Sequence, residues 1–232
     1  MRLDHVSYVA SHDQISDVVN RIGSQIGTAF VDGGIHPKFG TRNFTAPLLN
    51  GQYIEVVCPL DHPATDANPF GQAVKKKAEA GGGWLTWVFS SSDLGKVEEK
   101  FGRKAADGSR TRPDGSELKW KQIGVKDIMG SGELPFFIQW LTEMHPSKDG
   151  NSVAKIAKII STKNPLVTVV KKHVFSPAGR ETLIFRTFRQ SYLIEFFQVC
   201  DRMRSHATKC HKCDGGKRSH AIACDRCDRK PE

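Results

Sequence analysis

The chain begins with two hydrophobic periodicities in succession. Residues 3–10 carry the alternating apolar and β-branched side chains of a strand, and residues 11–26 carry apolar side chains at helical spacing. Alternating runs then recur between turn residues, which predicts strands over 28–32, 41–48 and 52–59. Asn50-Gly51 separates the last two runs, and this dipeptide is typical of a tight hairpin. The pattern predicts a β-α-β-β-β unit.

The same order of periodicities returns in the next eighty residues or so. A polar link and a short basic helix come first, at 61–69 and 71–80. A strand, a helix and three more strands are predicted after them, at 84–90, from 92 or 93, and at 103–112, 117–123 and 135–141. Residues 3–6 align with 84–87, and residues 53–56 align with 137–140. The second unit therefore repeats the first.

A partial third unit is predicted beyond the second. Its elements are a strand, a helix and two strands, at 153–161, 165–173, 182–189 and 192–199. We therefore expect an α+β protein of paired βαβββ modules, with a partial third unit and a short cysteine-rich tail. The expected bounds are 1–60 for the first module, 61–147 for the linker and second module, 148–199 for the third unit and 200–232 for the tail.

Two curved sheets of this kind enclose a cleft when they face each other, and the first and last strands of each module line it. The aligned positions on these strands are His5 and Glu55 in the first module, and Thr86 and Gln139 in the second. An imidazole and a carboxylate suit a divalent cation such as Mn, Fe, Ni or Zn. Glu55 also interrupts an apolar run, where a carboxylate has to be paired, protonated or bound to metal. An ion pair with Arg42 is the alternative.

The amino-acid sequence of several segments resembles the vicinal oxygen chelate superfamily, in its glyoxalase-like domain branch. The resemblance covers about residues 1 to 160. It implies a paired βαβββ fold, a cleft that holds a divalent metal in many members, and substrates bound through adjacent oxygen atoms. The segments that carry it are Leu3-Asp4-His5-Val6, Gly33-Gly34-Ile35-His36-Pro37 continuing to Gly40-Thr41-Arg42-Asn43, Tyr53-Ile54-Glu55, and Leu134-Pro135-Phe136-Phe137-Ile138-Gln139-Trp140 with His145-Pro146 after it.

The resemblance implies His, Glu or Gln at four metal-binding positions, and Thr86 departs from that pattern. The remaining candidates for metal ligands are His5, Glu55 and Gln139, which leave coordination positions open for water and a bidentate substrate. Glu55 is also the candidate residue for moving a proton. A cleft without metal is the alternative.

The candidates for substrate binding lie around the first hairpin. His36 stands in a loop bounded by glycine and proline, and Arg42 and Asn43 begin the next strand. Glycines allow a ligand to approach the backbone closely, and Arg42 offers a planar fork for a carboxylate or phosphate. An ordinary hairpin with polar caps is the alternative.

The formal net charge of +9 is concentrated at the end of the chain, since residues 171–232 hold 14 basic and 7 acidic side chains. Cys210 with Cys213 and Cys224 with Cys227 form two C-x2-C pairs there, which predicts a structural zinc site. A disordered basic end is the alternative. The charge favours a weak, salt-sensitive hold on nucleic acid, but the tail has no aromatic residue to stack on bases.

Composition and motifs argue against several classes of protein. No apolar run approaches the eighteen or so residues of a membrane span, and the charged first residues are unlike a secretory signal, so we expect a cytoplasmic protein. With 38% hydrophobic and 25% charged residues, the composition is typical of a globular chain. Neither a phosphate-binding loop nor the nucleophile elbow of a hydrolase occurs.

The expected function is the binding of a small oxygen-bearing metabolite between residues 3–59 and 84–141, followed by a metal-assisted lyase, isomerase or dioxygenase reaction. A metal-free protein that sequesters a small molecule is the second hypothesis. A nucleic-acid adaptor acting through the tail is the third. A homodimer is compatible with the resemblance, because modules of that family pair within one chain or across two.

Overall fold

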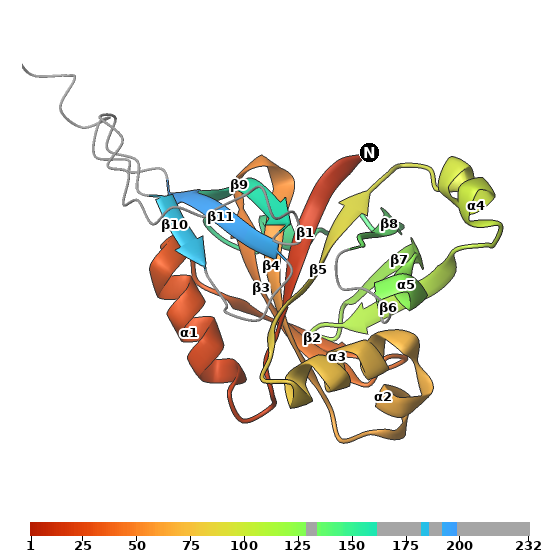
Figure 1. The fold of residues 1–232 in the computed structure, drawn as a ribbon, viewed down its shortest axis with the longest axis horizontal. Coiled ribbons are helices and arrows are strands. Elements are labelled where there is room, and N and C mark those ends of the chain that lie inside the picture. The colour runs from red at the N-terminus through yellow and green to blue at the C-terminus, as the bar shows by residue number, and fades with distance from the viewer. Residues whose placement is uncertain (129–133, 162–181, 186–191, 199–232) are drawn as a thin grey trace, which may run out of the picture. The chain divides into compact units, whose positions relative to one another are not determined.

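A computed structural model describes residues 1–128, 134–161, 182–185 and 192–198 (Figure 1). All of them lie in the first of the two units into which the chain divides, Met1–Cys200 and Asp201–Glu232. The predicted zinc site and the predicted helix at 165–173 fall outside the described residues. None of the helices in the described ranges is long and apolar enough to cross a membrane.

The two predicted βαβββ modules are confirmed. The first consists of β1 (Arg2–Val9), α1 (Ile15–Ile26), β2 (Val31–His36), β3 (Thr41–Leu48) and β4 (Gln52–Pro59). The second consists of β5 (Gly83–Ser90), α4 (Gly95–Phe101), β6 (Ala106–Thr111), β7 (Glu117–Ile123) and β8 (Phe136–Trp140), with the short helix α5 (Val125–Ile128) before the last strand. The order of elements therefore follows the repeat that the hydrophobic pattern predicts.

Some boundaries differ from the prediction for identifiable reasons. The connection between the modules contains a second helix: α2 (Pro63–Ala67) precedes α3 (Pro69–Glu79), and the side chains of His62 and Asn68 cap them. β2 runs through Gly33 and Gly34, although we expected a strand over 28–32 and a glycine-bounded loop around His36. Gly33 is a bulge residue there, because Asp32 pairs with Phe44 and Gly34 pairs with the next residue, Asn43.

The eight strands of the two modules close into a barrel in the order β1-β4-β3-β2-β6-β7-β8-β5. Within each module the first and last strands are parallel neighbours, β1 with β4 and β5 with β8. The modules join along the antiparallel pair β1 and β5, and again where Ile35 of β2 meets Thr111 of β6. The first and last strands of both modules therefore lie side by side in one wall.

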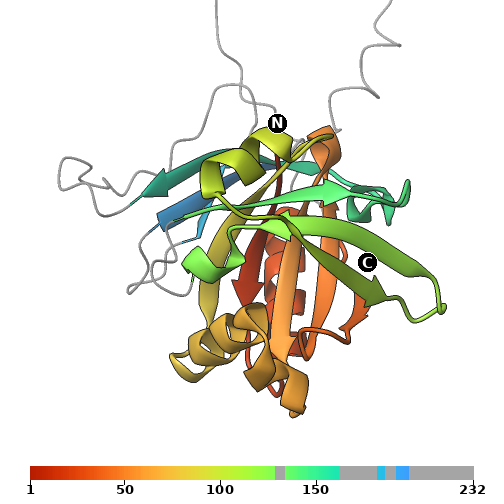
Figure 2. The ribbon, with the colours of Figure 1, turned by 90° about the vertical axis from the view of Figure 1, so that its right-hand side faces the viewer.

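Helices cover the outside of the barrel and one of its ends (Figure 2). Ile15, Ile22 and Ile26 of α1 pack against the first module, and α4 packs against Ile123 and Phe137 of the second. α3 lies at the barrel end, where its apolar side chains meet inward residues of both modules. The interior is therefore closed by apolar packing at the α3 end, which leaves the polar inward residues together further along the barrel.

The partial third unit is a separate small sheet. β9 (Ala154–Ser161), β10 (Thr182–Phe185) and β11 (Tyr192–Gln198) pair antiparallel in the order β10-β11-β9. Ala154 and Ile156 pack with the cluster between α1 and the first module. A 3-10 turn over Pro146–Lys148 leads into this sheet from β8.

Candidate functional site

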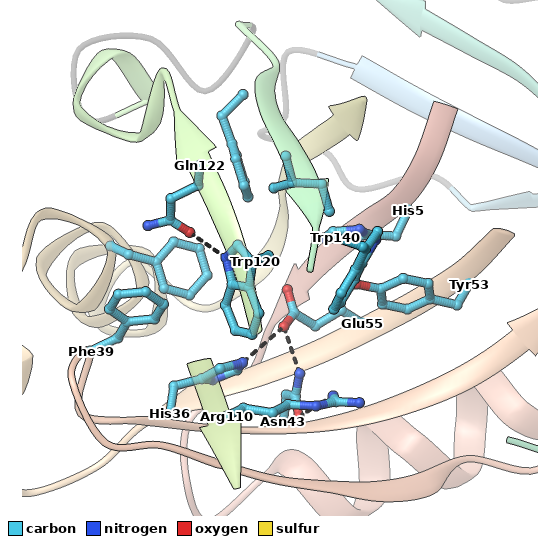
Figure 3. Close-up of a pocket in the computed structure, with 13 residues that line it drawn as sticks. His5, His36, Phe39, Asn43, Tyr53, Glu55, Arg110, Trp120, Gln122 and Trp140 are labelled. Atoms are coloured by element: carbon cyan, nitrogen blue, oxygen red, sulfur yellow. Dashed lines mark hydrogen bonds and ion pairs between the residues drawn. The ribbon is translucent and has the colours of Figure 1, made fainter. Parts of the chain in front are cut away.

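A pocket inside the barrel is lined by several buried polar side chains (Figure 3). Its free space is about 420 Å³ when the part open to solvent is counted. Both modules contribute walls: the first provides most of the polar groups, and the second provides mainly aromatic and aliphatic ones. The lining residues are His5, His36, Phe39, Asn43, Tyr53, Glu55, Phe70, Arg110, Trp120, Gln122, Phe136, Ile138 and Trp140.

β1 carries a bulge where it enters the pocket. Leu3 pairs with Phe89 of β5 and His5 pairs with Val88, so Asp4 is an extra residue in the ladder. A bulge interrupts the alternation of faces, and both Asp4 and His5 are buried. Asp4 Oδ1 lies 2.9 Å from His5 Nδ1. The ionised carboxylate can only accept, so His5 Nδ1–H donates this hydrogen bond. The other ring nitrogen, Nε2, is left without a hydrogen bond to any residue that the structure describes.

Asp4 is shared between two histidines. His145 Nδ1 accepts the Ser147 backbone N–H, so the proton of the neutral ring is on Nε2, 3.2 Å from Asp4 Oδ2. The same oxygen lies 3.3 Å from the indole nitrogen of Trp140. Burial raises the pKa of Asp4, but the hydrogen bonds with His145 and His5 outweigh it and hold the pKa well below its ordinary value. Asp4 is therefore ionised.

Glu55 is a buried carboxylate in the middle of the pocket. It is 5% exposed, and its two oxygens accept hydrogen bonds from Ser7 Oγ (2.6 Å) and Asn43 Nδ2 (2.7 Å). Burial raises the pKa of Glu55, but its interactions with His5 and His36 and these two hydrogen bonds outweigh burial, and the net shift is downward. Glu55 is ionised at neutral pH, and the predicted ion pair with Arg42 is replaced by neutral hydrogen-bond donors.

His36 is the last residue of β2 rather than part of a loop, and its ring enters the pocket. Nδ1 lies 3.0 Å from the Thr41 hydroxyl, and Nε2 lies 4.0 Å from Glu55 Oε1. The rings of Phe39 and Trp120 surround it. Burial lowers the pKa of His36 to about 4, despite the opposing effect of Glu55. The ring is therefore neutral at pH 7.

The neutral state of His36 predicts a loss of stability in mild acid. Because its pKa is about 4 in the folded chain and near 6.5 when exposed, the unfolded chain takes up the proton first as the pH falls between these values. This difference in pKa corresponds to a decrease of up to about 3 kcal/mol in the free energy of unfolding. Urea unfolding at pH 7.5 and pH 4.5 measures it. His36→Gln should lack this part of the pH dependence, whereas a change at exposed His12 should retain it.

Asn43 connects the carboxylate to a buried cation. Its Nδ2 donates to Glu55, and its Oδ1 accepts a hydrogen bond from Arg110 Nη1 at 2.9 Å. Gly33 makes room for this chain of contacts. A Cβ at Gly33 would lie 2.1 Å from Asn43 Oδ1 and 2.4 Å from Arg110 Nη1.

Gly33→Ala is therefore expected to displace the Asn43–Arg110 pair and to lower the free energy of unfolding by about 1 to 3 kcal/mol, the usual cost of overpacking. Urea unfolding measures this loss. Gly95→Ala is the matched control, because its Cβ would lie 3.2 Å from its nearest neighbour, an atom of the exposed Asp93 side chain. Equal stability of the two variants would contradict the expected overlap.

The structure brings together only some of the residues predicted for the site. His5, His36, Asn43 and Glu55 line the pocket, as Figure 3 shows. Arg42 lies on the other face of β3 and is paired with Asp32. The tail cysteines Cys210, Cys213, Cys224 and Cys227 lie outside the described residues.

Gln139 also points away from the pocket. The inward residues of β8 are Phe136, Ile138 and Trp140, and the Gln139 amide donates to the Ser92 carbonyl at 2.8 Å. Thr86 is not a lining residue either, since its hydroxyl donates to the carbonyl oxygen of Leu134 at 3.1 Å. The aligned repeat was one residue out of phase on β8, and a slip of one residue turns a strand's side chains to the opposite face.

The predicted metal ligands are consequently not assembled. No group of three or more His, Cys, Asp or Glu side chains among the described residues is arranged to hold an ion. The pocket side of the second module offers apolar residues where Gln139 was expected, and both oxygens of Glu55 already accept hydrogen bonds. The predicted set His5, Glu55 and Gln139 therefore does not form a metal site, and the chemistry is derived from the side chains of the pocket.

Three residues of the site escaped the sequence interpretation. Asp4 and His145 stand in segments that carry the family resemblance, but nothing in the sequence shows that they meet. Arg110 could have been found by alternation, because Gly108 and Arg110 are the buried positions of β6. An arginine in phase with an inward glycine is a signal for a buried cation.

The chain is similar to known proteins in sequence and in structure. The family model of a glyoxalase-like domain matches residues 3–172. A hypothetical protein from Staphylococcus aureus is 19% identical, with 68% of each chain covered and a TM-score of 0.49. Methylmalonyl-CoA epimerase from Mycobacterium tuberculosis is 17% identical, with 59% of this chain and 86% of that chain covered and a TM-score of 0.42.

A methylmalonyl-CoA epimerase in complex with methylmalonyl-CoA and NH4+ is 16% identical, with 62% and 98% covered and a TM-score of 0.42. No curated protein matches the chain. Sequence identities this low say nothing about a shared activity, so the function has to be argued from the pocket.

Proposed function

The chain belongs to the glyoxalase-like domain family, and from that premise we propose that its pocket binds a small oxygen-bearing metabolite and moves a proton on it. The observation that carries the proposal is Glu55, a buried and ionised carboxylate that lies beside a neutral histidine inside a pocket. Burying such a charge is costly, and acid–base chemistry is a common reason for retaining one. Of the predicted reaction classes, an isomerase is the one that these side chains supply by themselves.

In the proposed reaction Glu55 accepts a proton from a carbon next to a carbonyl group. The C–H bond breaks, and its electron pair forms the enolate, whose charge develops on the carbonyl oxygen. In the tautomer whose Nδ1 accepts a hydrogen bond from the Thr41 hydroxyl, Nε2–H donates a hydrogen bond to that oxygen. Return of the proton from Glu55 to the carbon restores the carbonyl compound.

Hydrogen exchange tests the proposal without knowledge of the natural substrate. The protein is incubated in D2O with pyruvate, pyruvamide, hydroxyacetone or dihydroxyacetone, and proton NMR follows the signal of the hydrogens next to the carbonyl. We expect at least one compound to exchange faster than in buffer alone. Binding without exchange would favour the second hypothesis, a protein that sequesters a small molecule. Neither binding nor exchange would contradict both.

The remaining sequence-based predictions stand as separate proposals. The two cysteine pairs of the tail are proposed to bind a structural zinc ion, because four thiolates at this spacing suit tetrahedral coordination. A cytoplasmic location is likewise proposed from the sequence, and a homodimer from the family resemblance.

A further inference from the structure

We infer that Arg110 binds a carboxylate group of the metabolite, so that the substrates of this pocket are small carboxylic acids. This inference rests on the proposed function, since it concerns the same pocket, and it names the chemical class of the ligand. It is carried by the hydrogen bonds that Arg110 makes and by those that it lacks.

Arg110 is 2% exposed and lines the pocket from β6. Nη1 donates to Asn43 Oδ1 at 2.9 Å. Nε and Nη2 are also buried, and neither has a hydrogen-bond partner among the residues that the structure describes. These two nitrogens form one edge of the planar guanidinium group, where their N–H bonds point in parallel. One whole edge of the fork is therefore free.

A free edge of this kind matches a carboxylate. Two parallel N–H groups reach the two oxygens of a planar carboxylate at once, which gives charge-assisted bonds of defined orientation. Leaving a buried charged donor without a partner is expensive. Nε and Nη2 are enclosed by protein, so a carboxylate that enters the pocket lined by Arg110 reaches them when the neighbouring side chains move aside.

The surrounding charges leave this role open. No carboxylate in the described part of the chain forms an ion pair with Arg110. Glu55 is separated from it by the Asn43 amide, and Asp149 is already held by Arg112 at 2.7 and 2.9 Å. If Arg110 served only to neutralise Glu55, a direct pair would be the simpler arrangement. The observed arrangement keeps the cation close to the carboxylate and leaves Nε and Nη2 without an acceptor among the described residues.

Asn43 also fixes the anion site relative to the base. One amide group contacts Glu55 through Nδ2 and Arg110 through Oδ1. A carboxylate on the free edge of Arg110 would therefore hold the neighbouring atoms of the ligand at a set distance from Glu55. Such positioning is what proton abstraction next to a carbonyl requires.

Matched ligands and variants of the full-length protein test the inference. Pyruvate and pyruvamide have nearly the same size, but only pyruvate carries a carboxylate. Their dissociation constants are measured by calorimetry for the wild type and for Arg110→Lys, Arg110→Gln and Arg42→Gln. Arg42 is the control, because it lies outside the pocket and is paired with Asp32. Arg110→Gln is also made together with Glu55→Gln, so that the variant does not leave an unbalanced buried carboxylate.

We expect the wild type to bind pyruvate at least about tenfold more tightly than pyruvamide. Arg110→Lys should weaken pyruvate binding about tenfold, because lysine keeps the charge but not the fork. Arg110→Gln should abolish the preference in both backgrounds, and Arg42→Gln should preserve it. Equal binding of acid and amide by the wild type, absence of binding of either, or a preference that survives Arg110→Gln would overturn the inference.

The outcome also separates this inference from the proposed function. Preferential binding of pyruvate without hydrogen exchange would support the Arg110 site and contradict proton transfer. Exchange of hydroxyacetone that is unaffected by Arg110→Gln, with no preference for the acid, would support proton transfer and overturn the Arg110 site.

Discussion

Glu55→Gln is expected to reduce the rate of hydrogen exchange by a factor of about 10² to 10⁴, the usual contribution of a general base. Glutamine has nearly the shape of glutamate but cannot accept the proton. The substitution should leave the fold intact, because the amide oxygen can still accept from Asn43 and the amide nitrogen can donate to the Ser7 hydroxyl. Initial exchange rates in D2O, measured by proton NMR at saturating ligand, give the factor directly.

Glu117→Gln is the control for this measurement. Glu117 is an exposed residue of β7 that pairs with Lys119 outside the pocket. The control variant should exchange at the wild-type rate. If Glu55→Gln also exchanged at that rate while binding the ligand normally, Glu55 would not be the base, and His5, with its free Nε2, would take its place as the candidate.

The modules were predictable because their periodicities are strong. Alternating runs of five to eight residues and the helical spacing of Ile15, Ile22 and Ile26 reflect burial of one face, and tertiary packing reinforced the same choice. The repeat added the pairing of two units. Neither signal specifies which face of a strand points inward at a given residue, so Glu55 was placed correctly in the pocket while Gln139 was not.

Bulges explain what the sequence could not show. At Asp4 the extra residue sets an acid and an imidazole on the same side of β1, although neighbouring residues of a strand normally face apart. At Gly33 a bulge within β2 leaves the space that Asn43 and Arg110 occupy. A bulge depends on the pairing of two strands, and that pairing depends on the whole barrel.

The network around Asp4 depends equally on distant segments. His145 follows β8 and meets a carboxylate near the start of the chain through a hydrogen bond of 3.2 Å. Trp140 of the same segment donates to that oxygen. The contact therefore joins the two modules at the pocket wall, where His5 depends on the same carboxylate for its orientation.

Asp4→Ala is accordingly expected to lower the free energy of unfolding by about 3 to 5 kcal/mol, the cost of removing one partner from a buried charged network. The substitution leaves the buried donors of His5, His145 and Trp140 without their acceptor. Urea unfolding at pH 7 measures the loss. Asp66→Ala is the control, because Asp66 is exposed and its pair with Lys75 should contribute no more than about 1 kcal/mol. Similar losses in the two variants would contradict the role assigned to the network.

The contribution of Asp4 should also disappear in acid, and its sign follows from the pKa. Because the pKa in the folded chain is below the ordinary value of 3.8, the unfolded chain binds the proton more readily. The stabilisation is therefore complete above about pH 5 and decreases as the pH falls below 4. Asp4→Asn keeps the size of the side chain and lacks this proton, so the difference in stability between wild type and variant should shrink between pH 5 and pH 3. A difference that stays constant over this interval would mean that the carboxylate is not ionised in the folded protein.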